Sequence, residues 1–315
     1  MLHIHNGDVT AALAARAGLP GRHMPFREAL MSGPVPGGLQ RRQWLAMRLA
    51  FITEAYAVGG EETLSRLLEQ EEAIDRAGGE EEIVLWFEHD LFCLVNLLYL
   101  LNRLEERMAS GQLSLVWFGA LMNGRVQGLG TLSIDEMTTL FQTRRVVDEA
   151  QYDSARRVWR TYTGGDAAAI NRALDGDPAF PFLGEGMSLH AARFPSVRNG
   201  LGRIEQEALD LIAGGQRDFR DLFPSFSARN SGYGLGDADF AWTLTRLERQ
   251  SQPLLGSSGQ MFADRSYDLT EAGESVRTGA ADNIALSGID LWLGGLHLQS
   301  PHHVIRWNGA ELKKE

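Results

Sequence analysis

A strand buried on both faces is predicted by the run Glu82-Ile83-Val84-Leu85-Trp86-Phe87, which leads into Glu88-His89-Asp90. The run is continuously apolar and rich in β-branched and aromatic residues, as are strands that helices cover on both sides. A long apolar helix is predicted from Leu91 to Met108, and another strand from Leu113 to Phe118. This alternation predicts a parallel sheet, because parallel strands need crossovers that lay helices on the sheet faces.

A second strand–helix–strand unit precedes this run. We expect a strand from Leu2 to His5, a helix from Val9 to Ala17 and a short strand from Gly21 to Phe26, followed after a Gly/Pro loop by helices between Gln40 and Arg76. The expected fold class is α/β, with a Rossmann-like, doubly wound parallel sheet. In such sheets ligands bind beyond the carboxyl ends of the strands.

The rest of the chain has a different pattern. Residues 131–193 are expected to form a helical annex to the sheet, so that residues 1–193 make one domain and residues 194–315 a second. In the second domain three helices precede a hairpin, which together predict a winged helix; the helices are expected at Ile204–Ala213, Phe219–Phe226 and Asp237–Arg249, and the hairpin between Pro253 and Leu269. Two segments near the end, residues 289–298 and 304–307, are expected to form a strand pair that ties the tail to the body.

Composition excludes several classes of protein. The 315 residues carry 30 Lys and Arg against 41 Asp and Glu, a net charge of −11 that argues against a broad nucleic-acid surface. The single Cys93 allows no internal disulfide, and the longest apolar stretch is too short to span a membrane. The first residues lack a basic and apolar signal peptide, so we expect a cytoplasmic protein that contacts no membrane.

The turn after the first strand is one candidate part of a site. An acid at the position of Asp8 can orient a ligand hydroxyl or a metal-bound water at the mouth of an α/β site. The preceding Asn6 and Gly7 can bring backbone N–H groups close to an anion at the helix N-terminus. The alternative is that Asp8 only caps the helix.

Glu88, His89 and Asp90 form the second candidate part, where the chain leaves the buried strand. A histidine between carboxylates has its protonated form favoured and could act as general acid, general base or metal ligand. Strand alternation puts Glu88 and Asp90 on one side and His89 on the other. The alternative is that Asp90 caps the next helix while Glu88 and His89 bond to neighbouring backbone.

Three arginines are candidates for holding an anion. Arg144 and Arg145 interrupt two predicted helices, and their guanidinium groups suit a phosphate or carboxylate. Alternatively, they only bridge to Asp148 or Glu149. Arg27, with the rigid loop at residues 33–36, is expected to form a wall of the same cleft.

No metal site is predicted. His3 and His5 point to the same face of a strand, but the sequence offers no third and fourth ligand beside them. The adjacent His302 and His303 would point apart. Serine nucleophile elbow, phosphate-binding loop, dinucleotide fingerprint and zinc-protease patterns are all missing from the sequence, so it specifies no cofactor and no reaction.

Six motifs resemble those of a family of bacterial proteins known chiefly as paired domains of unknown function. They are the opening motif that ends in Asn6-Gly7-Asp8, GPVP at residues 33–36, WFEHDLF at 86–92, TRR at 143–145 before DEAQ, FPSVRNGL at 194–201 and IDLWLGGLHL at 289–298. The resemblance covers nearly the whole chain and implies no established reaction. Some members carry the label of RNA polymerase sigma factor, but this acidic chain lacks the basic helices that promoter binding demands.

We therefore expect the strand ends to bind a small anionic ligand, such as a nucleotide or phosphorylated metabolite, and to act on it through Asp8, Glu88, His89 and Asp90. The alternative is a ligand-sensing regulator whose winged helix contacts another protein, or a second copy of the chain. DNA is the less favoured partner, because residues 203–277 hold 8 basic against 12 acidic side chains. A purely structural scaffold has no positive support in the sequence.

Overall fold

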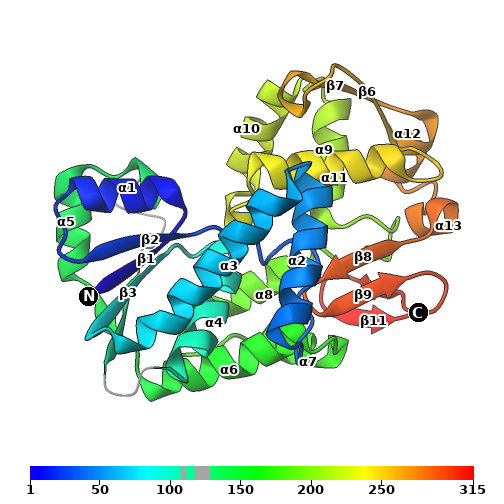
Figure 1. Ribbon diagram of the computed structural model, residues 1–315. Helices are drawn as coiled ribbons and strands as arrows, with labels where there is room; N and C mark the ends of the chain where they lie inside the picture. The colour runs from blue at the N-terminus through cyan, green and yellow to red at the C-terminus, as the bar shows by residue number, and fades with distance from the viewer. Residues whose placement is uncertain (108–110, 118–127) are drawn as a thin grey trace.

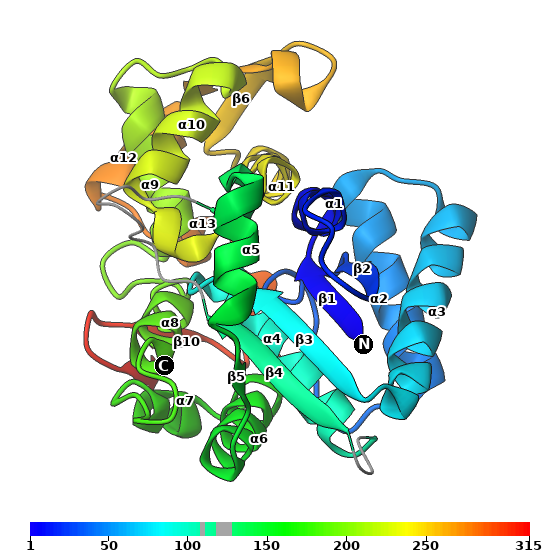
Figure 2. The ribbon, with the colours of Figure 1, turned by 90° about the vertical axis from the view of Figure 1, so that its left-hand side faces the viewer.

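The computed structural model describes residues 1–107, 111–117 and 128–315. Its main sheet has five strands in the order β2-β1-β3-β4-β5 (Figure 2). The first four are parallel and β5 runs antiparallel to β4. Their bounds are β1 Leu2–Asn6, β2 Arg22–Phe26, β3 Glu82–Phe87, β4 Gln112–Trp117 and β5 Arg145–Val146. The predicted α/β class with a mostly parallel sheet is confirmed.

Helices cover both faces of this sheet. All six side chains of β3 are buried, and its five apolar ones alternate between two apolar clusters. Val84 and Trp86 face the cluster that α1 (Asp8–Arg16) and α5 (Ile134–Gln142) cover. Ile83, Leu85 and Phe87 face the cluster built around α4 (Leu91–Glu105). This two-sided burial explains why the strand is continuously apolar.

The remaining helices of the first part join and flank these layers. α2 (Arg41–Tyr56) and α3 (Gly60–Arg76) connect β2 to β3 and lie beside α4 (Figure 1). The predicted helical annex contains α6 (Glu149–Thr163), α7 (Ala167–Ala173) and α8 (Leu183–Ala191). In the described part of the chain, no helix combines the length and apolar character that a membrane crossing requires.

Three helices and a hairpin form the next part, near the residues predicted for them. They are α9 (Arg203–Ala213), α10 (Phe219–Arg229), α11 (Asp237–Arg249) and the antiparallel strands β6 (Leu255–Ser258) and β7 (Ser266–Leu269). Two more helices follow, α12 (Glu271–Thr278) and α13 (Asn283–Ser287).

The strand pair predicted for the tail is wrong, because the chain forms two separate hairpins there. β8 (Asp290–Leu293) pairs with β9 (Leu296–Gln299), and β10 (Ile305–Trp307) pairs with β11 (Leu312–Lys314). The reversal occurs at Gly294, whose φ of 63° is a conformation that favours glycine.

The tip of the β8–β9 hairpin lies against the body. The Val35 amide donates to the carbonyl of Gly294 over 2.9 Å, and the Gly295 amide to that of Tyr162 over 2.8 Å. A Cβ at Gly295 would lie 1.9 Å from the carbonyl oxygen of Thr163, so only glycine permits this approach. One apolar cluster accordingly includes residues from Leu2 to Leu312 and continues through both parts of the chain.

Candidate functional site

The sheet order reverses between β1 and β3. From β1 the chain proceeds to β2 on one side, and from β3 to β4 on the other. The helices that follow these two strands, α1 and α4, cover opposite faces. A crevice at the carboxyl ends of two such strands is where open α/β sheets bind their ligands. The two sequence segments singled out above, residues 6–8 and 88–90, follow these two strands and are brought together by their pairing.

Asn6 and Gly7 form the turn from β1 into α1. The side-chain Nδ2 of Asn6 donates to Cys93 Sγ over 2.9 Å, and its Oδ1 accepts from Asn96 Nδ2 over 3.3 Å. Gly7 has φ 100° and takes the N-cap position, where no side chain caps the helix. The first backbone N–H groups of α1 therefore have no N-cap side chain as acceptor, and only the Asp8 carboxylate interacts with its own N–H there. Such groups favour an anion.

Asp8 is the first residue of α1 and is paired with Arg27, which directly follows β2. Arg27 Nε lies 2.9 Å from Oδ2 and Nη2 lies 2.6 Å from Oδ1. This hydrogen bonding lowers the pKa of Asp8, and the pair is open to solvent, with 64% of the Asp8 side chain and 51% of the Arg27 side chain exposed. The alternative that Asp8 only caps the helix is wrong, since Gly7 holds that position.

Glu88 is a half-buried carboxyl group at the end of β3. Its Oε1 accepts a hydrogen bond from the Leu129 amide over 2.7 Å. Burial, with a smaller contribution from the charge of Asp90, raises the pKa of Glu88 to about 6. A carboxyl group with this pKa can exchange a proton near neutral pH, as a general acid or base must.

Asp90 is the N-cap of α4, as the alternative stated. Its carboxylate accepts from the Cys93 amide over 2.8 Å. Gly234 packs against it so closely that a Cβ there would lie 2.1 Å from Oδ1. Burial raises the pKa of Asp90. These contacts give Asp90 a structural role at the edge of the site.

The ring of His89 lies against an aromatic side chain of the helical annex. Its ring stacks on Phe182 with the centroids 4.3 Å apart, whereas Glu88 faces Leu129. The expectation that neighbouring carboxylates favour protonated His89 is wrong, because burial lowers its pKa.

Arg144 and Arg145 do not complete this site, and their predicted placement is wrong. Arg144 Nε donates to Oε1 of Glu82 over 2.9 Å, and Glu82 is the first residue of β3, at the opposite end of the sheet. Arg145 is exposed and pairs with Leu115 in the middle of β4. The length of an arginine side chain allows Arg144 to reach back along the strands to this acid.

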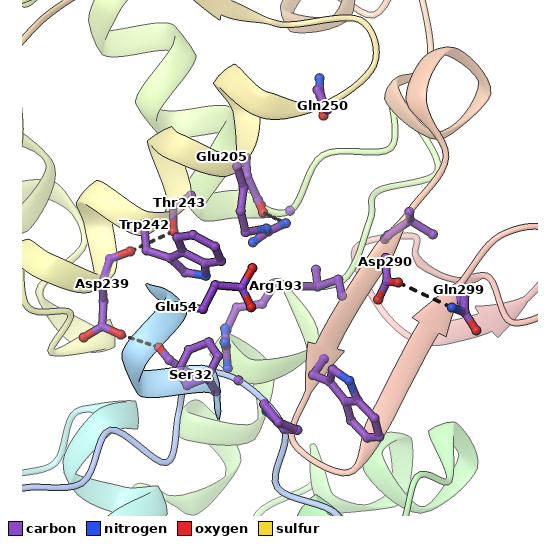
Figure 3. A pocket seen from close by; sticks show the side chains of 18 of the residues that line it. Ser32, Glu54, Arg193, Glu205, Asp239, Trp242, Thr243, Gln250, Asp290 and Gln299 are labelled. Atoms are coloured by element: carbon purple, nitrogen blue, oxygen red, sulfur yellow. Dashed lines mark hydrogen bonds and ion pairs between the residues drawn. The ribbon is translucent and has the colours of Figure 1, made fainter. Parts of the chain in front are cut away.

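A large pocket lies outside the predicted site, and sequence reasoning did not find it. Its volume is about 1310 Å³, and its walls come from α2, α11 and the β8–β9 hairpin (Figure 3). Asp239 of α11 accepts hydrogen bonds from Ser32 over 2.5 Å and from Tyr56 over 2.7 Å. Arg193, only 8% exposed, lines the pocket and donates to the Met31 carbonyl over 2.7 Å. The pocket thus joins the two sequence halves through polar contacts.

Sequence reasoning also missed His23. It pairs with His3 in the register of β1 and β2, which places it beside the predicted pair His3 and His5. The signal was present in the sequence, since both strands were predicted, but their register was not.

No known protein-family model and no curated protein sequence matches this chain.

Proposed function

We propose that this protein binds a small anionic molecule, such as a nucleotide or a phosphorylated metabolite, at the carboxyl ends of β1 and β3. One observation carries the proposal: the sheet order reverses at these two strands, and the first of them leads into a helix N-terminus without a side-chain cap. The motifs at residues 6–8 and 86–92 resemble those of a bacterial family, and this resemblance is part of the proposal. It does not identify the ligand.

In this proposal Arg27 binds the anionic group. It is exposed and lies beside the first turn of α1, through its pair with Asp8. An exposed ion pair has a small net stability, so a phosphate oxygen can replace the Asp8 carboxylate at little cost. Asp8 then acts as a competitor that keeps Arg27 oriented when no ligand is bound.

Glu88 is the group that we propose for proton transfer. Among the four acid–base residues predicted from the sequence, Asp90 is held by the α4 amide, Asp8 by Arg27, and His89 faces Phe182. Glu88 retains a raised pKa of about 6 and has one carboxyl oxygen, Oε2, with no hydrogen bond to the described residues. We propose acid–base chemistry on the bound ligand, with Glu88 as the catalytic residue.

The test is a thermal-shift screen of the full chain against nucleotides, sugar phosphates and inorganic pyrophosphate, repeated on two variants. Arg27→Gln should lose the ligand-induced shift. Glu88→Gln keeps the acceptor for Leu129 and should keep the shift while losing any turnover. The matched control for the first is Arg220→Gln, another exposed arginine paired with a carboxylate. An equal shift in wild-type and Arg27→Gln chains would refute the binding mode.

A second candidate function is a ligand-sensing regulator, and the pocket of Figure 3 favours it. The segment α9 to β7 has the element order of a winged helix, with α11 in the place of the helix that enters the DNA groove. Trp242, Thr243 and Arg246 of α11 line the pocket opposite α2. A ligand in this pocket would contact both parts of the chain.

For this candidate, a protein or a second copy of the chain is a better partner than DNA. α2 contacts α11, and the first turn of α11 carries the exposed Asp237. The measurement is fluorescence anisotropy with labelled generic duplex DNA over a salt series. We expect no binding at low salt; binding with a steep salt dependence would reverse this preference.

A further inference from the structure

Three histidines meet on the face of the sheet that α1 and α5 cover. His3 and His5 lie on β1, and His23 lies on β2 in register with His3. One ligand nitrogen of each ring lies within 4.8 Å of those of the other two. His3 and His5 are fully buried and His23 is half-buried. This cluster lies on the sheet face, apart from the strand-end site.

Hydrogen bonds to fixed partners define how the rings are protonated. The indole N–H of Trp86 can only donate, so His3 Nδ1 accepts from it over 3.0 Å and His3 Nε2 donates to the Pro20 carbonyl over 2.8 Å. His23 Nε2 donates to the Leu19 carbonyl over 3.3 Å, which leaves its Nδ1 with a lone pair. Both rings thus donate one N–H to a backbone carbonyl; the lone pair of His3 accepts from Trp86, and that of His23 faces His5.

His5 completes the set. Its Nε2 lies 3.0 Å from His23 Nδ1, and its Nδ1 is buried without a hydrogen-bond partner among the described residues. With His23 Nδ1 as acceptor, His5 Nε2 carries the proton and Nδ1 holds an unused lone pair.

We propose that His3, His5 and His23 form a binding site for a divalent transition-metal ion of the zinc type. Neutral imidazoles are ligands for zinc, cobalt, nickel and copper ions but not for magnesium or calcium. Metal-binding histidines regularly donate their other ring N–H to a backbone carbonyl, as His3 and His23 do here.

Two of the three ligand nitrogens already lie at the spacing that a metal ion needs, and all three lie within 4.8 Å of one another. Two nitrogens at about 2.05 Å from a tetrahedral zinc ion are roughly 3.3 Å apart, close to the 3.0 Å between His5 Nε2 and His23 Nδ1. The proton on His5 Nε2 moves to Nδ1. The ion takes the His3 lone pair, so the buried indole N–H of Trp86 gives up its acceptor, a cost that metal binding must exceed. The exposed turn at Pro20, Gly21 and Arg22 lies next to His23 and provides the path for the ion. Three protein ligands leave a fourth position for water or an exogenous anion.

The experiment is titration of the chelator-treated full chain with Co²⁺, followed by its visible ligand-field absorption, and then competition with Zn²⁺. We expect one Co²⁺ per chain in a site of low coordination number, and displacement by one equivalent of Zn²⁺. The variant His23→Gln removes the half-buried ligand. Loss of a residue that only hydrogen-bonds to a metal ligand typically weakens metal binding by roughly 10–100-fold, so loss of a ligand itself should weaken it by at least as much. His5→Leu, which keeps an apolar side chain of similar size in the core, should have the same effect.

The control is the double variant His302→Gln/His303→Gln, which removes two exposed histidines from the tail. It should bind Co²⁺ as the wild-type chain does. Circular dichroism of the metal-free variants establishes that they are folded before they are titrated. If the wild-type chain binds no Co²⁺, or if folded His23→Gln binds it as tightly as wild type, the metal site does not exist. If the tail variant alone loses the ion, the tail histidines are the ligands and the proposal is equally overturned.

Discussion

The Arg27 guanidinium contacts both carboxylate oxygens of Asp8, with Nε 2.9 Å from Oδ2 and Nη2 2.6 Å from Oδ1. This ion pair connects the end of β2 to the first turn of α1 at the point where the sheet order reverses. Because both side chains are exposed, the ion pair orients Arg27 but contributes little net stability, so another anion can replace the Asp8 carboxylate. An arginine held in this way is available to an anion that competes with the carboxylate.

The variant Asp8→Asn should therefore strengthen anion binding. Loss of the carboxylate removes the competitor for Arg27, so the Kd of pyrophosphate measured by calorimetry should fall several-fold. The free energy of unfolding should change by less than about 1 kcal/mol, since exposed ion pairs contribute little. The comparison variant is Asp264→Asn, which breaks the exposed pair with Arg220. Weaker pyrophosphate binding in Asp8→Asn would assign the carboxylate a direct role in holding the ligand.

Glu88 should make the protein less stable as pH rises. Its pKa is about 6 in the folded chain against 4.5 ordinarily, so the folded state binds the proton more tightly than the unfolded state. Stability from this group is complete below the ordinary pKa and is lost as pH rises through the folded pKa. The loss amounts to at most about 2 kcal/mol, from 1.36 kcal/mol per pKa unit.

Urea unfolding of wild type and Glu88→Gln across this pH range measures the effect. The difference between the two should grow from pH 4.5 to pH 6 and then remain constant, with the variant the more stable chain above the folded pKa. Glu248→Gln, at another half-buried glutamate that is paired with Arg265, serves as the control. A pH-independent difference for Glu88→Gln would mean that the Glu88 carboxyl titrates normally.

Asp90→Ala should destabilise the protein by about 0.5–2 kcal/mol, because it removes the N-cap acceptor of α4. Asp90→Asn keeps an acceptor of the same shape and should cost much less. The quantity to compare is the urea midpoint of the two variants at one pH. Equal losses in both would indicate that the charge of Asp90, and not its capping bond, is what the fold uses.

The tip of the tail hairpin should tolerate no side chain. At Gly294 the positive φ and a Cβ only 2.4 Å from the Tyr162 carbonyl oxygen both oppose substitution. Gly294→Ala should cost more than about 2 kcal/mol, the sum of backbone strain and overpacking. Gly18→Ala has a similar positive φ, at 68°, but no atom within 4 Å of its Cβ, so it isolates the backbone contribution. Equal melting temperatures for the two variants would show that the hairpin is not tightly docked.

Local sequence patterns predicted the elements that surround the site. The apolar run of β3, the cap at Asp90 and the turn at Gly7 depend on neighbours in the chain, and the structure has all three where they were expected. The position of the strand ends follows from such patterns, because parallel connectivity alone puts them at one edge of the sheet.

What could not be predicted depends on register and on the reach of long side chains. His23 lies beside His3 because of the pairing register of β1 and β2. The alternation of side chains within each strand does not determine that register. Arg144 was expected at the strand ends, but its guanidinium binds Glu82 at the opposite end of β3. The pocket between α2, α11 and the tail hairpin needs the packing of segments about 200 residues apart, as the contact of Ser32 with Asp239 illustrates.

The most direct measurement is the stabilisation of the full chain by pyrophosphate and nucleotides, compared between the wild type and Arg27→Gln. If a ligand binds at the ends of β1 and β3, the wild type should gain about 2.7 kcal/mol at a ligand concentration 100 times the Kd, and Arg27→Gln should gain almost nothing at that concentration. If both chains gain equally, or if only variants of the α2–α11 pocket such as Arg193→Gln lose the effect, the strand-end site is not the site of ligand binding.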